Sequence, residues 1–190
     1  MIYGLVGYKG SGKTTACNII KKNLTDVVQI NFKDALVQEL KDNFPDLLDA
    51  ILDNLNEECP PGSRPFNIDD LFDWKPPLVR TLMQNYGTDV RRKEDSNYWV
   101  KKWMTSVGCK NPANHIIVDD VRFFNESYAI RKWNDTILIR LERTDIVTTD
   151  QHQSETEQQQ IECDYTISVG QGELDKLEEE LIKILNVHNP

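Results

Sequence analysis

Short apolar runs alternate with amphipathic stretches along most of this chain. Such runs have the length and composition of strands that are buried on both faces of a sheet. They occupy Ile2–Val6, Val27–Asn31, His115–Asp120, Thr136–Leu141 and Tyr165–Val169. Between them the apolar positions recur with a helical period, which predicts helices over 14–22, 32–40, 124–133 and 174–185. This alternation predicts an α/β fold with a five-stranded parallel sheet covered by helices on both faces.

The alternation is interrupted between Pro45 and about Pro77. A helical piece at 47–52 is followed by a proline-rich and glycine-rich stretch at 59–65. The interruption is too long for a simple connection, so we expect a helical excursion, extending over about 45–110. A chain of 190 residues is long enough for one well-packed domain, and we expect a single domain over 1–190.

Two further helices are expected inside this excursion. The first covers 78–86 and is predicted to end at Gly87, since glycine is common just after a helix. The second is capped by Asp95 or Ser96 and carries Trp99, Trp103 and Val107 at spacings of four. We expect this apolar stripe to pack in the core, and stacking of a tryptophan on a base is the less favoured alternative.

The segment Gly7–Thr14 reads Gly-Tyr-Lys-Gly-Ser-Gly-Lys-Thr and fits the pattern of a phosphate-binding loop. A strand is predicted before it and a helix after it, which is the context that the pattern requires. Backbone N–H groups and the helix dipole would then surround a triphosphate, with Lys13 at its β- and γ-phosphates and the Thr14 hydroxyl on Mg²⁺. The expected nucleotide-binding residues are Gly7, Lys9, Gly10, Ser11, Gly12, Lys13, Thr14 and Thr15. A glycine-rich turn that happens to end in Lys-Thr is the alternative.

Two carboxylates, Asp119 and Asp120, close the third apolar run. A carboxylate at such a strand end can hold Mg²⁺ beside the Thr14 hydroxyl. Neighbouring strand residues point to opposite faces, so we expect only one of the two to do so. The alternative is a helix cap or a solvated strand end.

Arginines gather at or beyond the ends of the predicted elements. They are Arg80, Arg91, Arg92, Arg122, Arg140 and Arg143. Phosphoryl transfer needs positive charge around the migrating group, although an exposed arginine is often only a solvated charge. Arg140 and Arg143 precede a polar stretch, Glu142–Gln160, and we expect a lid over about 142–154.

The net charge of −9 argues against binding to a nucleic-acid polymer, which is held mainly by clustered lysine and arginine. The four cysteines lack the paired spacing of a zinc site, so we expect free thiols in a reducing cytosol. We find no long apolar run and no leader-like start, and therefore expect a cytoplasmic protein with no membrane segment.

Several ordered segments together resemble the deoxynucleoside monophosphate kinases of bacteriophages and bacterial genomes, a branch of the P-loop nucleoside monophosphate kinases. The segments are Gly7–Thr14, Phe32–Leu36, Tyr86–Arg92 followed by Trp99, Asp120–Glu126 and His152–Glu155. The resemblance implies a P-loop kinase fold and transfer of the γ-phosphoryl group of ATP to a deoxynucleoside 5′-monophosphate. The products would be ADP and the diphosphate, in deoxynucleotide supply for DNA synthesis, in the host cytoplasm if the protein is encoded by a phage.

The resemblance also implies roles for individual residues. Lys13 would hold the donor, and Thr14 with Asp120 or Asp119 would hold Mg²⁺. The acceptor would be bound by a set of residues led by Arg122 and Arg92 at its phosphate and Lys33 and Asp34 at its nucleoside, with Arg80, Gly87, Thr88, Arg91 and Trp99 nearby. Arg143 and Arg140 would act on the transferring group from the lid.

Two other functions fit part of the pattern. Another small-acceptor P-loop kinase, such as a dephospho-coenzyme A kinase, would share the loop and fold. A nucleotide-dependent switch or assembly ATPase would hydrolyse ATP slowly without an acceptor. The sequence leaves open which bases are accepted, whether ribose forms are excluded and whether the protein forms a homodimer.

Overall fold

A computed structural model describes residues 1–60, 62–109, 115–145 and 156–188. The chain divides into two compact units. The sheet unit comprises Met1–Phe32 and Trp103–Pro190, and the helical unit comprises Lys33–Lys102. Each unit has its own set of packed elements.

The sheet unit is built on five parallel strands in the order β2-β3-β1-β4-β5. The strands are β1 (Ile2–Val6), β2 (Val27–Gln29), β3 (His115–Val118), β4 (Thr136–Arg143) and β5 (Tyr165–Val169). The central strand β1 pairs with both β3 and β4, so that Ile2 lies opposite Ile116 and Thr136. The prediction of a five-stranded parallel sheet is confirmed, and the carboxyl ends of all strands therefore share one edge.

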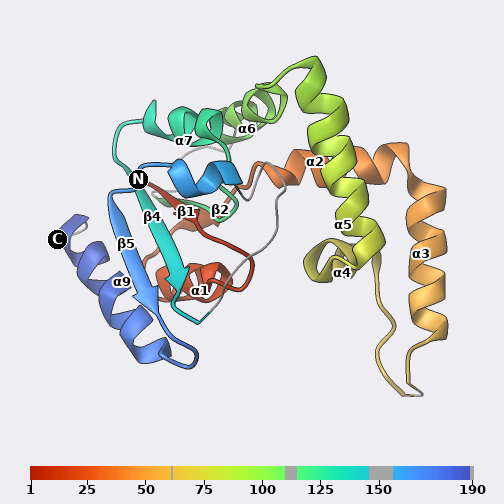
Figure 1. Ribbon diagram of the computed structural model, residues 1–190, viewed down its shortest axis with the longest axis horizontal. Coiled ribbons are helices and arrows are strands. Elements are labelled where there is room, and N and C mark those ends of the chain that lie inside the picture. The colour runs from red at the N-terminus through yellow and green to blue at the C-terminus, as the bar shows by residue number, and fades with distance from the viewer. Residues whose placement is uncertain (61, 110–114, 146–155, 189–190) are drawn as a thin grey trace. The chain divides into compact units, whose positions relative to one another are not determined.

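Both faces of this sheet are covered. Helices α1 (Lys13–Asn23) and α9 (Leu174–His188) lie on one face and α7 (Phe124–Arg131) lies on the other (Figure 1). Tyr3 and Leu5 of β1 pack in the core beneath α1 and α9. Gly4 faces the other way, where an added Cβ would overlap Leu138 and lie 3.2 Å from Cδ1 of Ile130 in α7. The strand is apolar throughout because neither of its faces meets water.

The helical unit has a separate apolar core. Its elements are α2 (Lys33–Asn43), α3 (Pro45–Glu57), α4 (Ile68–Trp74), α5 (Pro77–Gln84), a π-helix η1 (Asn85–Arg92) and the first residues of α6 (Tyr98–Cys109). Leu40, Leu48, Leu71 and Val79 are fully buried in this core. Asn67 begins α4 by accepting the N–H groups of Asp69 and Asp70 with its side chain, at 2.9 and 3.1 Å.

The structure corrects the expected helix end at Gly87. The helical run continues from α5 through the π-helix to Arg92, and Gly87 is buried inside it. Gly87 does not adopt a positive φ, which a C-terminal capping glycine would require. Its carbonyl accepts a hydrogen bond of 2.9 Å from Nε1 of Trp99. Trp99 is twelve residues away, so the sequence immediately around Gly87 gives no sign of this contact.

Two arginines also lie elsewhere than expected. Arg80 is inside α5 and Arg140 is inside β4, whereas we expected both at or beyond the ends of elements. The reason for Arg140 is that β4 extends to Arg143, since the polar residues Glu142 and Arg143 continue its pairing with β5.

The apolar stripe of α6 is buried, as predicted. Trp99, Trp103 and Val107 are 2%, 1% and 5% exposed. Nε1 of Trp103 donates to the Ile30 carbonyl at 2.9 Å, and its ring packs on Phe32 with centroids 4.8 Å apart. The stripe therefore serves packing, with each indole N–H bound to a backbone carbonyl.

Among the described residues, no helix combines the length and the apolar character that crossing a membrane demands. Cys17, Cys59 and Cys163 are free thiols.

We expect Ile20→Ala to lower the free energy of unfolding by about 2–5 kcal/mol, because it leaves a cavity between α1 and the sheet. Ile20 is fully buried in the sheet-unit core. Urea unfolding followed by circular dichroism measures the loss. Asn18→Ala, at an exposed position of the same helix, is the matched control and should change the free energy by no more than about 0.5 kcal/mol. Equal losses in the two variants would contradict the packing described for α1.

Candidate active site

The segment Gly7–Gly12 leaves the carboxyl end of β1 and leads directly into α1. Gly10 and Gly12 have φ values of 82° and 97°, which side-chain-bearing residues rarely adopt. A Cβ on Gly7 would lie 2.5 Å from the backbone oxygen of Leu141 in the neighbouring strand β4. Local geometry therefore explains why glycine stands at each of these three positions. The loop also has the strand-loop-helix context that phosphate binding needs.

Lys13 lies at the start of α1 and folds back over the loop. Its Nζ donates to the carbonyls of Gly7 and Tyr8 at 2.5 and 2.7 Å. The first turn of α1 has no acidic residue, and Lys21 and Lys22 lie in its last turn. The N-terminus of α1 therefore combines an ammonium group with the positive end of a helix dipole, an arrangement suited to an anionic ligand.

Asp119 and Asp120 follow β3 at the same edge of the sheet. Oδ1 of Asp120 accepts the backbone N–H of Phe32 at 3.0 Å, and Oδ1 of Asn31 accepts the backbone N–H of Asp119 at 2.9 Å. These two bonds connect the chain after β2 with the chain after β3. A carboxylate that accepts one N–H retains further acceptor positions, so either aspartate can still ligate a cation.

The turn that carries Arg122 is held by a buried carboxylate. Glu126 is 2% exposed, and its Oε2 accepts the backbone N–H groups of Arg122 and Phe123 at 2.8 and 3.1 Å. Oε1 of Glu157 accepts the next N–H, that of Phe124, at 2.8 Å. Two carboxylates thus bind the first N–H groups at the start of α7, which orders the backbone at Arg122.

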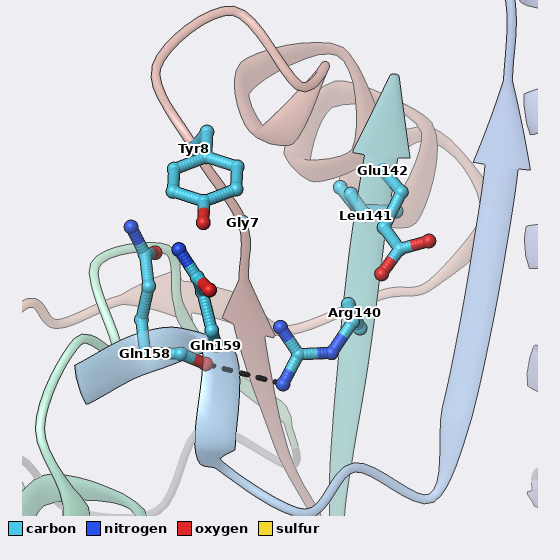
Figure 2. Close-up of a pocket in the computed structure, with 7 residues that line it drawn as sticks. All are labelled: Gly7, Tyr8, Arg140, Leu141, Glu142, Gln158 and Gln159. Carbon is cyan, nitrogen blue, oxygen red and sulfur yellow. Dashed lines mark hydrogen bonds between the residues drawn. The ribbon is translucent and has the colours of Figure 1, made fainter. Parts of the chain in front are cut away.

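A pocket of about 310 Å³ opens beside the first residues of the loop. It is lined by Gly7, Tyr8, Arg140, Leu141, Glu142, Gln158 and Gln159. Figure 2 shows the hydroxyl of Tyr8 directed toward the side-chain amides of Gln158 and Gln159, which belong to a short 3-10 helix, η2 (Gln158–Gln160). The pocket therefore presents hydroxyl, amide and guanidinium groups, together with the Glu142 carboxylate, next to the P-loop.

Arg140 and Arg143, both in β4, have different surroundings. Arg140 Nη2 donates to the Gln158 carbonyl at 3.1 Å (Figure 2). It also donates to the Ile161 carbonyl at 2.5 Å, and the two bonds fasten η2 to β4. Arg143 makes a two-pronged contact with Asp145 at 2.8 and 2.7 Å, and its Nη1 lies 3.5 Å from the Gly10 carbonyl. Hydrogen bonds from Arg143 lower the pKa of Asp145. Within the described part of the chain, Arg143 thus reaches the P-loop at the Gly10 carbonyl, whereas the bonds of Arg140 go to the chain at Gln158 and Ile161.

Most of the expected lid lies outside the described residues. The residues 146–155 are outside them, and these include the segment His152–Glu155 on which part of the resemblance rests.

In the helical unit, the charged centre is Glu39 of α2. Its carboxylate accepts hydrogen bonds from the hydroxyls of Tyr98 and Tyr86 at 2.5 and 3.1 Å and from Nε of Arg91 at 3.2 Å. Lys102 Nζ lies 3.4 Å away. Burial is the largest single influence and opposes ionisation, but the bonds from Tyr98 and Tyr86, the charge of Arg91 and the contact with Lys102 outweigh it. The pKa of Glu39 is therefore lowered.

The neighbouring arginines of the helical unit differ in their partners. Arg91 is bound to Glu39 and to Glu94, at 3.1 and 3.4 Å. Arg92 donates to the carbonyl of Ser96 at 3.3 Å. The remaining predicted acceptor residues of this unit are Lys33 and Asp34 in the first turn of α2, Arg80 in α5, Gly87 and Thr88 in η1, and Trp99 in α6.

Sequence reasoning did not single out Glu39, Glu126, Glu157 or the Gln158–Gln159 pair. Glu126 had a signal, since it stands three residues after Phe123, where a side chain can reach back to the N–H groups at a helix start. Gln158 had no such signal. It is only 1% exposed, but it lies in a stretch of polar residues whose composition predicts an exposed position.

We expect Glu39→Gln to lower the melting temperature at pH 7 and to have a smaller effect at pH 3. The folded-state pKa of Glu39 is lowered, so its contribution to stability is present above its unfolded pKa and is lost as the pH falls through the folded value. The charged and titratable groups that face it are Arg91 with its partner Glu94, Lys102, Tyr86 and Tyr98. Melting curves of both proteins between pH 3 and pH 7 measure the difference.

Asp42→Asn, which changes an exposed carboxylate on the same helix, is the control and should shift the melting temperature by about 1 °C or less at any of these pH values. A gap between wild type and Glu39→Gln that widens toward pH 3 would contradict the network.

Comparison with known proteins adds independent information. The family model for deoxynucleotide monophosphate kinase matches residues 66–181, more than half of the chain. The match begins after the P-loop, so it rests on the later segments and not on the phosphate-binding loop. A curated relative from Acanthamoeba polyphaga mimivirus, which carries the provisional name deoxynucleotide monophosphate kinase, is 26% identical over 98% of this chain and 96% of its own.

Two solved structures are also similar. TT1252 from Thermus thermophilus is 13% identical, with a TM-score of 0.47 over 100% of this chain and 98% of its own. Dephospho-CoA kinase from Campylobacter jejuni is 14% identical, with a TM-score of 0.45 over 97% of this chain and 95% of its own. Membership of a kinase family implies a phosphotransferase that uses ATP and acts on a nucleotide. By the family match, the predicted resemblance is confirmed, and the chain belongs to the deoxynucleotide monophosphate kinase family.

Proposed function

We propose that this protein transfers the γ-phosphoryl group of ATP to a deoxynucleoside 5′-monophosphate, yielding ADP and the deoxynucleoside diphosphate. The observation that carries the proposal is Lys13, folded over a glycine loop between β1 and α1, in a chain of the deoxynucleotide monophosphate kinase family. The donor phosphates bind the loop amides and Lys13, with Lys9, Ser11 and Thr15 on either side. The reaction needs no protein nucleophile, because one bound substrate attacks the other directly.

Arg143 is the arginine that we assign to the transferring phosphoryl group. Its contact with the Gly10 carbonyl supports this role, and exchange of Asp145 for a phosphate oxygen would keep the same two-pronged geometry. Arg140 is expected to act by holding η2 against β4, since its guanidinium donates to two backbone carbonyls. The segment 142–154 is proposed to form the lid of the same single domain.

Thr14 and the Asp119–Asp120 pair are the residues that would hold Mg²⁺. They offer hydroxyl and carboxylate oxygens, which are the ligands that Mg²⁺ prefers. Among the described residues, no group of three or more His, Cys, Asp or Glu side chains is arranged to hold a metal ion. That donor set fits an ion bound mainly through phosphate oxygens and one or two carboxylates. When bound, Mg²⁺ neutralises charge that develops on the β- and γ-phosphates.

Arg122 and Arg92 are assigned to the acceptor phosphate, and Lys33 and Asp34 to its nucleoside. Support for Arg122 comes from the Glu126 carboxylate, which orders its backbone at the start of α7. Arg80, Gly87 and Thr88 complete the proposed acceptor residues. The burial of Trp99 and its bond to Gly87 favour a packing role for this side chain over contact with the acceptor.

The purified protein should release ADP from Mg-ATP in the presence of one or more deoxynucleoside monophosphates. A coupled assay over the common deoxynucleotides and ribonucleotides measures this. Lys13→Ala should lower kcat/KM by at least about 100-fold, because it removes a fixed positive charge at the transferring phosphates. Lys22→Ala, at an exposed lysine of the same helix, should leave the rate within about twofold.

If the protein phosphorylated dephospho-coenzyme A and none of the deoxynucleotides, dephospho-coenzyme A would replace the proposed acceptor. ATP hydrolysis that is unaffected by every acceptor would point to a switch-type ATPase. Full activity of Lys13→Ala would remove its assigned role.

Arg122→Ala should raise KM for the deoxynucleotide by about 10- to 100-fold, the loss expected for charged hydrogen bonds to a phosphate, and leave KM for ATP unchanged. Steady-state kinetics with each substrate varied in turn separate the two constants. Arg131→Ala, in the same helix region but paired with Asp164, is the matched control. An unchanged acceptor KM in the Arg122 variant would show that this arginine does not bind the acceptor.

A further inference from the structure

The π-helix η1 places Tyr86 and Arg91 on the same side of the helix. In an α-helix, residues five apart are separated by about 140° around the axis, because each residue turns the chain by about 100°. A π-helix closes its hydrogen-bonded turn over five residues, so positions five apart come together. Tyr86 and Arg91 are such a pair, and Nε of Arg91 donates to the Tyr86 hydroxyl at 3.1 Å.

Both side chains of this pair also bind Glu39. One carboxylate of α2 thereby collects donors from η1 (Tyr86 and Arg91) and from α6 (Tyr98 and Lys102), at distances of 2.5 to 3.4 Å. The Glu39 side chain is only 15% exposed. The interaction is therefore partly shielded from solvent, where a charged hydrogen bond is worth more than at the surface.

The Arg91 guanidinium is enclosed on its flat sides as well. It packs over the rings of Tyr86 and Tyr98, with its Cζ 5.2 and 5.0 Å from their centroids. Its nitrogen atoms bind Glu39, Tyr86 and Glu94. A side chain held in this way is a structural partner of Glu39. The neighbouring Arg92 donates to the exposed backbone carbonyl of Ser96.

A second contact reinforces the wide turn near its first residues. The Gly87 carbonyl accepts the indole N–H of Trp99, and a Cβ at Gly87 would come within 3.1 Å of Cδ2 of Leu36. Glycine thus allows α2 to approach the π-helix closely. Because a π-helix is rare and less favourable than an α-helix, contacts of this kind must stabilise it.

We propose that Glu39 is a positioning residue that holds Asn85–Arg92 in its π-helical form and thereby sets the direction of Arg92. Arg91 is its partner and not a ligand of the acceptor. Without Glu39 the segment can relax toward α-helical geometry, and losing the one extra residue of the turn rotates the following side chains by about 100°. The role assigned to Arg92 rests on the proposed function, whereas the clamp on η1 does not.

Amide hydrogen exchange tests the clamp independently of any activity. Glu39→Gln and Arg91→Gln should both speed exchange at 85–92 by at least about tenfold, and leave the amides of α1 unchanged. Tyr98→Phe, which removes one hydroxyl and keeps the ring, should have a smaller effect in the same place and serves if Glu39→Gln does not fold. Asp42→Asn is the matched control. Unchanged exchange at 85–92 in Glu39→Gln and Tyr98→Phe would overturn the proposal.

Kinetics test the consequence for Arg92. Arg92→Gln should raise KM for the deoxynucleotide about tenfold, and Glu39→Gln should raise the same constant without changing KM for ATP. Arg91→Gln should lower the melting temperature together with any rise in KM for the deoxynucleotide. Arg91→Lys, which keeps the positive charge, should bring this KM part of the way back toward the wild-type value. The double variant Glu39→Gln/Arg92→Gln should be no worse than the poorer single variant, because Glu39 acts through Arg92.

An additive loss in the double variant would overturn action through Arg92. An Arg91→Gln protein with a raised acceptor KM and an unchanged melting temperature would instead make Arg91 the ligand. If the wild-type protein turned over no deoxynucleotide, the proposed function would fail, and the exchange experiment would still decide whether Glu39 clamps η1.

Discussion

The sheet unit of this molecule depends on a central strand, β1, that is buried on both faces and paired in parallel on both edges. Because β1 lies between β3 and β4, its carboxyl end emerges at the same edge as the aspartates after β3 and the arginines of β4. The register places Val6 opposite Arg140, so the next residue, Gly7, lies against the Leu141 carbonyl. The pairing that gives the sheet its cohesion therefore also decides which residue can begin the phosphate-binding loop.

Backbone N–H groups along this edge are bound by side chains of other segments. Asp120 binds Phe32, Asn31 binds Asp119, and Glu126 binds Arg122. These bonds link segments that are distant in sequence and hold the loops that carry the proposed ligands. Such preorganisation reduces the rearrangement that a charged ligand must cause when it binds.

Sequence alone predicted the sheet, the P-loop and the helix after it because these follow from short-range patterns. Tyr3, Leu5 and Ile20 have the spacing of buried strand and helix positions, and the loop glycines answer to local backbone geometry. The end of the helix before Gly87 was predicted wrongly, because Trp99 and Glu39, which stabilise the continuing turn, stand twelve and forty-eight residues away.

Side-chain direction was the other feature that the pattern could not supply. Arg140 and Arg143 look equivalent in the sequence, as nearby cations at a strand end. In the structure Arg140 donates to the carbonyls of Gln158 and Ile161, whereas Arg143 reaches the carbonyl of Gly10. Likewise Arg91 and Arg92 are adjacent in sequence, but Arg91 binds the Glu39 carboxylate at 3.1 Å and Arg92 donates to the Ser96 carbonyl at 3.3 Å. These differences arise from tertiary contacts that periodicity does not encode.

The helical unit is one uninterrupted stretch of the gene, Lys33–Lys102, and it contains its own apolar core. Recombination or point mutation within that stretch can remodel the packing among α2 to α5 without touching the residues that form the P-loop. Under the proposed division of labour, acceptor preference is thus open to evolutionary drift while the chemistry of the donor is conserved. A library confined to this stretch would be a compact way to search for kinases with new nucleotide preferences.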